Sequence, residues 1–497
     1  MRTAYAVEKV RAAERELMAR LPEGALMGRA AAGLAAVCAG LLGRVYGSRA
    51  VLLVGSGDNG GDALYAGARL ARRGARVSAV LLAPDRAHPG GLAALRRAGG
   101  RILGPADDPF AVLADADLVL DGITGIGGHG GLRADAVPVA RAARGCDAVV
   151  VAVDLPSGVA ADDGTVTGEV LRADVTVTFG TYKPGLLIDP AAEVAGVLRL
   201  VDIGLGPHLP SVPAVEALQH ADVARLLPAP GGESDKYRRG LVGIVAGSAK
   251  YPGAAVLAVA GALRGGAGAV RYVGPGGDAV LARHPETLVS EGPPARAGRV
   301  QAWAVGPGLH EGRGLDDALA SDVPVLIDAD GLRGLDAGTV RARSAPTLLT
   351  PHAGEAAALL GAERAEVEAG RLAAVRELAA RYGATVLLKG STTLVADPDP
   401  GVPVRVNATG TPWLATAGSG DVLTGLTGSL LAAGLPTRDA ASVGAYLHGL
   451  AARLAARGAP LAAEDVAGHI PAAWRNVMGE AAGPRPGGPG REQDDEV

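Results

Sequence analysis

Large aromatic side chains are scarce in this sequence of 497 residues: Phe, Trp and Tyr together make up 3% of it. Glycine, in contrast, accounts for 75 residues, and hydrophobic residues make up 48%. The chain can therefore bury sizeable cores, but these cores must be built mostly from Ala, Val and Leu. Such a composition favours layered sheets and helices in close contact, and the length predicts two or three domains.

Cysteine and excess positive charge are also scarce. The two cysteines, Cys38 and Cys146, have neither the spacing of metal ligands nor that of a disulfide framework, which fits a reducing cytoplasm. We expect both thiols to be buried as small apolar groups. The formal net charge of -4, without a basic block interleaved with aromatics, argues against a nucleic-acid partner.

The sequence also lacks the pattern of a signal peptide or a membrane span. Charged residues between Glu8 and Glu16 occupy the region where a signal peptide would need an apolar core. The least polar stretch, Ala30 to Gly43, is too short and too rich in Ala and Gly to cross a bilayer. We interpret it as a core helix and expect a cytoplasmic protein without a membrane partner.

Short apolar runs alternate with helical patterns in the first part of the chain. The predicted strands are Ala50–Val54, Ala75–Leu82, Asp117–Leu120, Ala148–Val153 and Val175–Thr178, and the predicted helices between them are Ala63–Arg73, Gly91–Ala98 and Ala134–Arg144. This alternation predicts an α/β domain with a Rossmann-like, doubly wound parallel sheet. Ligands bind such sheets at the carboxyl ends of the strands.

Three of these strand ends lead into polar, glycine-rich loops. The first is GSGDNGGDA (55–63), the second is DGITGIGGHGGL, which opens with Asp121, and the third is DLPSG, which opens with Asp154. Taken alone, each could be an ordinary glycine turn, and Asp154 could merely cap a turn. Together, Asn59, Asp121 and Ser157 could bring hard oxygen ligands to one cation. Asp154 would then stand beside the bound ligand.

These three motifs closely resemble the epimerase domain of bifunctional NAD(P)H-hydrate repair enzymes, over roughly residues 1 to 210. The resemblance implies that the hydrated nicotinamide nucleotide contacts Asp154 and two loops, one formed by Asp58, Asn59, Gly60, Gly61 and Asp62 and the other by Gly125, Ile126, Gly127, Gly128, His129, Gly130 and Gly131. It also implies that Asn59, Asp121 and Ser157 bind a K⁺ ion.

Two positions in this half bear on the resemblance. Ile126 stands where the family usually has Thr, so affinity for the substrate could be lower without loss of the fold. Lys183, in TYKPG, also fits the family pattern, and the alternative for it is a solvated surface lysine.

A second α/β series follows a stretch, Ile203 to Glu233, that is rich in Pro and Gly. We expect a first domain at residues 1–210, a linker at 211–233 and a second domain at 234–480. The tail, 483–497, cannot bury apolar surface and is expected to be disordered. The predicted strands of the second series are Leu241–Ala246, Ala269–Val273, Gln301–Val305, Val323–Ile327, Thr347–Leu349 and Thr385–Leu388.

The most informative stretch of this half is GTPWLATAGSGDVLTG, residues 410–425. Its small residues allow close approach of a ligand, and the apolar run after Asp421 predicts a helix. A helix N-terminus binds anions through unpaired N–H groups and the macrodipole. Asp421 could then act as a general base beside a bound phosphate. The alternative is that Asp421 only caps the helix.

Other strand ends of the second half carry GSAKYPGAA, VGPGL, LIDADGL, LLTPHAGE and LLKGSTT. His352, in the fourth motif, could be a core or capping histidine. Lys389, in the last motif, could be a solvated lysine, but a lysine followed by glycine and hydroxyl residues suits a nucleotide phosphate better.

In this order the motifs resemble the ribokinase-like fold, and more closely the ADP-dependent NAD(P)H-hydrate dehydratase domain, over roughly residues 230 to 475. The resemblance implies that Ala254, Gly308, His352 and Asp421 line the hydrate site. It implies that Lys389, Gly390, Ser391, Thr392, Thr393 and Gly420 hold the adenine nucleotide. One departure is Arg333, which follows Leu332 where the family often has Asn.

The expected function is metabolite repair by a bifunctional enzyme that epimerises the R and S forms of hydrated NADH and NADPH and dehydrates the S form. ADP would phosphorylate the ring hydroxyl, a poor leaving group, and phosphate would depart as the ring double bond reforms. We expect Asp421 to be the base, Asp154 to do acid/base work in the first half, and Mg²⁺ to accompany the phosphate chemistry. Exposed Ala- and Gly-rich helices lead us to expect a homo-oligomer.

Two other functions fit parts of this pattern. The first is a ribokinase-like small-molecule kinase, because GSGD before a phosphate-binding helix occurs across that fold. The second treats the first half as a nucleotide-binding or protein-binding module without catalysis. Replacing Asp154 by Ala separates these readings, since a pure binding module would keep its output.

Overall fold

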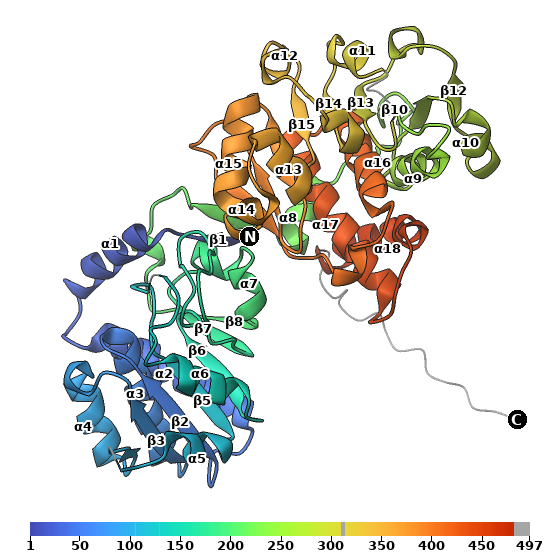
Figure 1. Ribbon diagram of the computed structural model, residues 1–497. Coiled ribbons are helices and arrows are strands. Elements are labelled where there is room, and N and C mark those ends of the chain that lie inside the picture. The colour runs from blue at the N-terminus through green and yellow to red at the C-terminus, as the bar shows by residue number, and fades with distance from the viewer. Residues whose placement is uncertain (105, 129, 310–313, 482–497) are drawn as a thin grey trace, which may run out of the picture. The chain divides into compact units, whose positions relative to one another are not determined.

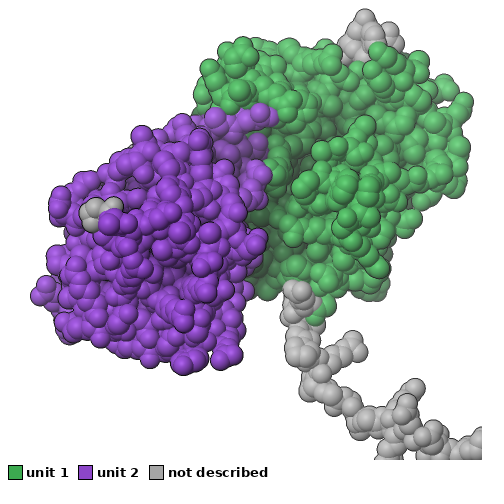
Figure 2. All heavy atoms as spheres, turned by 60° about the horizontal axis from the view of Figure 1, so that its bottom comes forward, with its two compact units in different colours: residues 1–2, 217–367, 374–497 green, residues 3–216, 368–373 purple. Residues whose placement is uncertain are grey.

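The computed structural model describes residues 1–104, 106–128, 130–309 and 314–481. The chain divides into two compact units, coloured separately in Figure 2. The N-terminal unit comprises residues 3–216 and 368–373, and the C-terminal unit comprises residues 1–2, 217–367 and the residues from 374 onward. Strands β1 (Arg2–Ala4) and β9 (Val215–Ala217) lie at the boundary between these sets of residues.

The N-terminal unit is built on a seven-stranded sheet in the order β4-β3-β2-β5-β6-β7-β8, in which all neighbouring strands are parallel (Figure 1). The strands are β2 (Arg49–Val54), β3 (Arg76–Leu81), β4 (Arg101–Ile102), β5 (Leu118–Gly122), β6 (Val149–Val153), β7 (Val175–Phe179) and β8 (Val197–Val201). The strand order reverses beside β2, as in a doubly wound sheet, so the predicted fold of this half is confirmed.

Both faces of this sheet are buried, which explains the continuous apolar runs in its strands. Along β2, Leu52 and Val54 join one core cluster, whereas Val51 and Leu53 join another. The first cluster is covered by α1 (Val7–Met18), α2 (Ala25–Leu42), α3 (Asp58–Arg72) and α4 (Pro89–Arg97), and the second by α5 (Pro109–Ala114) and α6 (Val137–Arg144). A short helix, α7 (Ala191–Val194), precedes β8.

Helix α2 has the length and apolar composition of a membrane span, with a mean hydropathy of 1.7 over 18 residues. One face of it, including Ala30, Leu34 and Cys38, is nevertheless buried in the first core cluster. The interpretation of this stretch as a core helix therefore holds for that face. Burial raises the pKa of the Cys38 thiol to about 12, as expected for a structural thiol, whereas Cys146 is only half-buried.

The C-terminal unit contains a larger sheet, with the order β18-β17-β16-β15-β14-β13-β10-β11-β12 (Figure 1). Its strands are β10 (Leu241–Val245), β11 (Ala269–Val273), β12 (Leu288–Ser290), β13 (Ala302–Val305), β14 (Val325–Ile327), β15 (Thr347–Leu349), β16 (Thr385–Leu388), β17 (Thr393–Ala396) and β18 (Val404–Asn407). Neighbouring strands are parallel along the run β12-β11-β10-β13-β14-β15-β16 of the sheet. In contrast, β17 pairs antiparallel with both β16 and β18. All six predicted strands are present, and β12, β17 and β18 were not predicted.

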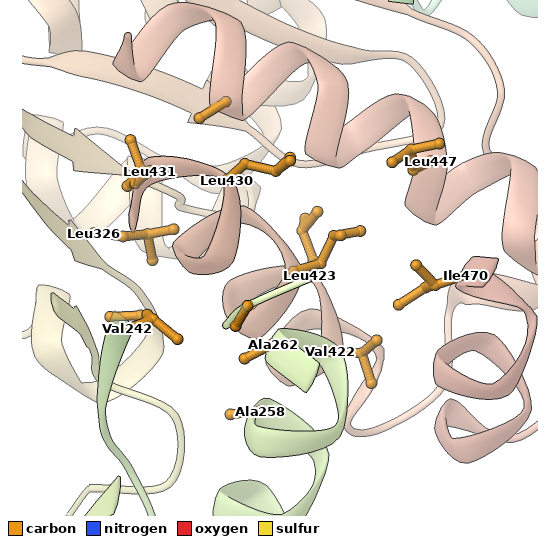
Figure 3. Close-up of a cluster of buried hydrophobic side chains, with 14 of the residues drawn as sticks. Val242, Ala258, Ala262, Leu326, Val422, Leu423, Leu430, Leu431, Leu447 and Ile470 are labelled. Carbon is orange, nitrogen blue, oxygen red and sulfur yellow. The ribbon is translucent and has the colours of Figure 1, made fainter. Parts of the chain in front are cut away.

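Helix α16 (Ser419–Ala432) is buried along almost its whole length. Figure 3 shows its Val422, Leu423, Leu430 and Leu431 among side chains from β10, β14, α9 (Pro252–Arg264), α17 (Thr437–Ala456) and α18 (Ala463–Ala481). The remaining helices are α8 (His220–Leu226), α10 (Gly277–Arg283), α11 (Leu315–Leu319), α12 (Ala337–Arg341), α13 (Ala353–Leu360), α14 (Arg364–Ala369) and α15 (Arg371–Tyr382).

The contact between α9 and α16 explains how a core poor in aromatics is closely packed. A Cβ atom on Gly425 would lie 1.8 Å from the carbonyl oxygen of Ala258, and one on Gly261 would lie 2.2 Å from that of Val422. Only glycine allows the two helix backbones to approach so closely.

The stretch expected to be a linker contains β9 and α8. Helix α8 carries a capping box between Gln219 and Asp222, and its Val223 is fully buried in the core of the C-terminal unit. Pro and Gly around α8 concealed a helix of only two turns. The expected tail, 483–497, lies outside the described residues.

Candidate functional site

The carboxyl edge of the N-terminal sheet is formed by tightly packed turns. A Cβ atom on Gly55 would lie 1.8 Å from the carbonyl oxygen of Ile123, so the turn after β2 requires glycine. Gly57 has a φ of 91° and precedes α3, which begins at Asp58. The residues from Asp58 to Asp62, expected as a loop, are therefore the first turn of α3.

Asp121 and Ser157 meet at this edge. The Asp121 Oδ2 accepts a hydrogen bond from the Ser157 backbone N–H at 2.8 Å, and its Oδ1 accepts one from the Ser157 hydroxyl at 2.6 Å. Complete burial raises the pKa of Asp121 to about 6, although the hydrogen bonds from Ser157 act in the opposite direction.

Asn59 lies next to the same turn. A Cβ atom on Gly125 would lie 3.0 Å from the Asn59 Oδ1, and the neighbouring Thr124 N–H donates to the Ser157 hydroxyl at 2.9 Å. The Asn59 Nδ2 is buried without a hydrogen-bond partner. The structure thus brings Asn59, Asp121 and Ser157 to one turn, where their side chains offer carboxylate, hydroxyl and amide oxygens.

Asp154 is held by a buried cation. It follows β6 with a φ of 66°, a strained conformation for a residue with a side chain. Its Oδ1 accepts hydrogen bonds from the Lys183 ammonium at 2.5 Å and from the Thr178 hydroxyl at 2.9 Å. Lys183 is 1% exposed, so the alternative of a solvated surface lysine is wrong.

Two further carboxyl groups lie in the electrostatic field of this pair. Burial, followed by the negative charges of Asp154, Asp58 and Glu14, raises the pKa of Asp62 well above its ordinary value. Burial also raises the pKa of Glu14 on α1, against the opposing charge of Lys183. The sequence reasoning missed Glu14, because nothing in a charged amphipathic helix distinguishes one Glu from its neighbours.

The second glycine loop contains Ile126, the residue that departs from the family pattern. Ile126 is partly buried against two apolar clusters of the N-terminal unit rather than presented as a polar contact. Gly130 and Gly131 have φ values of 76° and 84°, which favour glycine. His129 lies outside the described residues.

The C-terminal unit has its own charged centre at the carboxyl ends of β14 and β16. The Lys389 ammonium donates to the Asp328 Oδ1 at 2.7 Å and lies 3.7 Å from Glu355. The Thr424 hydroxyl donates to the Asp328 Oδ2 at 2.6 Å. Burial acts to lower the pKa of Lys389, but the surrounding carboxylates, Asp328 first, raise it overall.

Asp421 occupies the first turn of α16 beside this centre. The helix cap is Gly418, with a φ of 87°, and no side chain caps the first turn, so Asp421 is not a capping residue. Burial, then the charge of Asp328, raises the pKa of Asp421 to about 7, against the lowering effect of Lys389. A carboxyl that titrates near neutral pH beside a helix N-terminus can accept a proton next to a bound anion.

His448 contacts the first residue of α16, and the sequence did not predict it as a site residue. Its Nε2 is 2.9 Å from the Ser419 carbonyl oxygen, and burial lowers its pKa to about 4. The ring is therefore neutral at ordinary pH and donates to that carbonyl. The only signal in the sequence is a lone histidine on an apolar helix, which usually indicates a core residue.

The predicted hydrate-site residues fall into two places. Gly308, with a φ of 63°, lies against Ala254, since a Cβ atom on it would be 2.8 Å from the Ala254 Cβ. His352 is exposed and caps α13 through a capping box with Glu355, so the capping alternative describes its hydrogen bond. Arg333, the departure from the family pattern, forms a 3.1 Å ion pair with Asp330.

The predicted nucleotide-binding residues form the connection between β16 and β17. Lys389 follows β16, its backbone N–H donates to the Pro351 carbonyl at 2.8 Å, and Thr393 begins β17. A Cβ atom on Gly420 would lie 3.6 Å from the Lys389 Nζ, which brings this connection next to the first turn of α16. Gly390, Ser391 and Thr392 lie within the same connection.

A cleft of about 950 Å³ opens at the carboxyl ends of β10, β11 and β13. Its walls include Gly247, Ser248, Lys250 and Leu309. Leu309 directly follows Gly308, so the cleft adjoins the predicted hydrate site. Within the described parts of the chain, no group of three or more His, Cys, Asp or Glu side chains could hold a metal ion.

Two family models match the chain. Residues 23–185 match the model described as YjeF-related protein N-terminus, and residues 242–471 match the model described as NAD(P)H-hydrate dehydratase. The first match lies within the N-terminal unit, and the second lies within the C-terminal unit apart from residues 368–373.

Individual relatives match over most of the chain. The bifunctional NAD(P)H-hydrate repair enzyme Nnr of Mycobacterium tuberculosis is 50% identical, over 95% of this chain and 99% of its own length. The enzyme of the same name from Corynebacterium glutamicum is 37% identical, over 77% and 78%. A crystal structure of the ADP/ATP-dependent NAD(P)H-hydrate dehydratase from Bacillus subtilis, co-crystallised with ATP and Mg²⁺, is 30% identical and covers 52% of this chain and 97% of its own, with a TM-score of 0.48. On this similarity across both halves, the chain belongs to the family of bifunctional NAD(P)H-hydrate repair enzymes.

Proposed function

We propose that the N-terminal unit epimerises hydrated NADH and NADPH, and that the C-terminal unit dehydrates the S epimer at the expense of ADP. Family membership supports the pair of activities, and one observation carries the assignment of the second site. Asp421, with a pKa near 7, stands in the first turn of a buried helix beside Lys389. That combination supplies a proton acceptor and an anion site at one point.

In the dehydratase reaction, Asp421 accepts the proton of the ring hydroxyl as the hydroxyl oxygen attacks the terminal phosphorus of ADP. AMP leaves with the electrons of the broken phosphoanhydride bond. The phosphate then departs from the ring with its bonding electron pair, a proton is lost from the neighbouring ring carbon, and the electrons of that C–H bond form the ring double bond, giving NAD(P)H, AMP and phosphate. The N–H groups at the start of α16 and the Lys389 ammonium stabilise the negative charge on the transferring phosphoryl group. Ala254 and Gly308 leave room for the hydrated ring, because neither carries a side chain beyond a methyl group.

In the epimerase reaction, inversion at the hydroxyl-bearing carbon requires that one of its bonds be broken and remade, with one proton removed and one delivered. Asp154 is the acid/base group for this step, and Lys183 and Thr178 hold its carboxylate in place. The first turn of α3 and the loop from Gly125 to Gly131 bind the nucleotide.

The two ions have different support. K⁺ prefers hard oxygen ligands, and Asn59, Asp121 and Ser157 offer three kinds of oxygen around one turn. Mg²⁺ binds largely through phosphates and water, so it would enter with the nucleotide, and no side chain of this unit is assigned to it. We further propose a cytoplasmic location, and assembly into a homo-oligomer stays a prediction.

Recovery of the near-ultraviolet absorbance of reduced nicotinamide tests both activities. The substrate is a mixed-epimer hydrate, supplied with ADP or ATP, and the proteins are the wild type, Asp421→Ala and Asp154→Ala. We expect full ADP-dependent recovery of the absorbance in the wild type and none in Asp421→Ala. In Asp154→Ala the second half of the absorbance, from the epimer that must first be converted, should return slowly. The absence of recovery with either nucleotide would refute the repair function and favour the small-molecule kinase.

A further inference from the structure

Asp328 is a buried carboxylate of the C-terminal unit with both side-chain oxygens hydrogen-bonded. It is 1% exposed, at the carboxyl end of β14. One carboxylate oxygen accepts from Lys389 at 2.7 Å and the other from Thr424 at 2.6 Å, while its backbone N–H donates to the Val305 carbonyl at 2.9 Å. A single side chain thus connects β14, the residue after β16, and helix α16.

The position of Lys389 decides what Asp421 can do. If the ammonium paired directly with Asp421, the carboxylate would be a weaker base, because an adjacent positive charge favours the ionised form. The structure instead places the ammonium at Asp328 and within 3.7 Å of Glu355. The positive charge remains close enough to act on a bound phosphate, as its effect on Asp421 indicates.

Thr424 gives Asp328 a second point of contact with the site. Thr424 follows Asp421 by three residues, so the two lie on the same side of α16 one turn apart. Anchoring the Thr424 hydroxyl fixes the rotation of the first turn, on which the orientation of Asp421 and of the helix N–H groups depends. His448, on α17, makes a separate hydrogen bond to the Ser419 carbonyl at the start of α16.

We propose that Asp328 is a positioning residue of the dehydratase: it keeps the Lys389 ammonium off Asp421 and anchors the first turn of α16 through Thr424. Asp421 thereby stays available to accept the proton of the ring hydroxyl. The proposal rests on the proposed function of the C-terminal unit.

The decisive variant is Asp328→Asn, which keeps the size of the side chain and removes its charge. The variant removes the negative charge that raises the pKa of Asp421, and it leaves the ammonium able to turn to Asp421. Both changes make Asp421 ionise at lower pH and become a weaker base. The other titratable groups around Asp421, which are Asp330, Glu355, Lys389 and His448, are left in place. We expect kcat to fall about tenfold or more, and the acid limb of the pH profile to move down by about 1 pH unit or more.

Thr424→Val and Thr427→Val form a matched pair for the anchoring role. Both replace a buried hydroxyl of α16 by a methyl group, but Thr427 lies one turn further along the helix and its hydroxyl has no hydrogen-bond partner. We expect Thr424→Val to lower kcat and raise the KM for ADP several-fold, without moving the acid limb. Thr427→Val should match the wild type in all three quantities.

The experiment measures kcat, KM and the pH profile of ADP-dependent recovery from the S hydrate, with folding checked by tryptophan fluorescence. A merely structural role for Asp328 would lower activity equally at every pH, so an unmoved acid limb in folded Asp328→Asn overturns the proposal. If that variant does not fold, Thr424→Val decides, and equality with Thr427→Val overturns the proposal. A wild type without ADP-dependent recovery would instead refute the proposed function itself.

Discussion

Replacing Asp421 by Asn should slow dehydration severely and, at the same time, stabilise the C-terminal unit. Burial and the charge of Asp328 raise the pKa of Asp421 from 3.8 to about 7, so the folded protein opposes its ionisation. The full difference corresponds to about 4 kcal/mol above pH 7, and screening of the partly exposed carboxylate reduces this to about 2 to 4 kcal/mol. Asn carries no such cost.

The direction in which this stability difference changes with pH follows from proton linkage. Below about pH 4 the Asp421 carboxyl is protonated in both the folded and the unfolded chain, and its contribution to stability is fully present. As the pH rises through about 7, the unfolded chain releases the proton first, and the wild type loses that stability. The gain of Asp421→Asn over the wild type should therefore grow from pH 4 to 7 and stay constant above.

The measurement is denaturant unfolding followed by tryptophan fluorescence at several pH values. All three tryptophans, Trp303, Trp413 and Trp474, belong to the C-terminal unit, so the signal reports that unit alone. Asp278→Asn is a matched control, because Asp278 also lies in the first turn of a helix but is exposed. A gain that does not change with pH, or destabilisation at pH 8, would refute the argument from burial.

The same carboxyl predicts that wild-type kcat for dehydration falls as the pH drops through about 7, and Asp421→Asn should lose about 10² to 10⁴-fold in kcat at pH 8. In the N-terminal unit, Asp154→Asn should slow epimerisation by a similar factor without affecting dehydration of purified S hydrate, and loss of both activities would contradict two separate sites. Gly425→Ala should destabilise the C-terminal unit by more than about 3 kcal/mol, because the added methyl carbon would meet the Ala258 carbonyl at 1.8 Å; a stability within about 0.5 kcal/mol of the wild type in the fluorescence assay would show that α9 can yield. Exchanging K⁺ for tetramethylammonium should slow epimerisation, with dehydration of purified S hydrate as the internal control; equal epimerisation rates in both salts would argue against the cation site.

Most strands of the two sheets could be predicted because they are short apolar runs buried on two faces. The strands that were missed lack this signal. β17 and β18 pair antiparallel at the side of the larger sheet, β8 has no fully buried residue, and β1, β4, β9 and β12 are at most three residues long. Helix α8 was hidden by the Pro and Gly around it, although Gln219 and Asp222 form its capping box.

The candidate sites also contain residues that the sequence could predict and residues that it could not. The glycine turns and the acidic residues after strands are local signals, and the structure does bring Asn59, Asp121 and Ser157 together. The partners of these residues could not be predicted, because they are remote in sequence: Lys183 is 29 residues from Asp154, and Thr424 is 96 residues from Asp328. Sequence spacing cannot say whether a lysine is solvated or fully buried.

The backbone contact between α9 and α16 has a consequence for how the enzyme can vary. Since Gly261 and Gly425 each meet a carbonyl of the opposite helix, α16 cannot slide along α9 or turn about its own axis without a collision. The proton acceptor and the anion site are therefore a fixed frame against which substrates must align. We therefore expect substitutions that alter substrate preference to act through the residues that line the cleft rather than through a shift of α16.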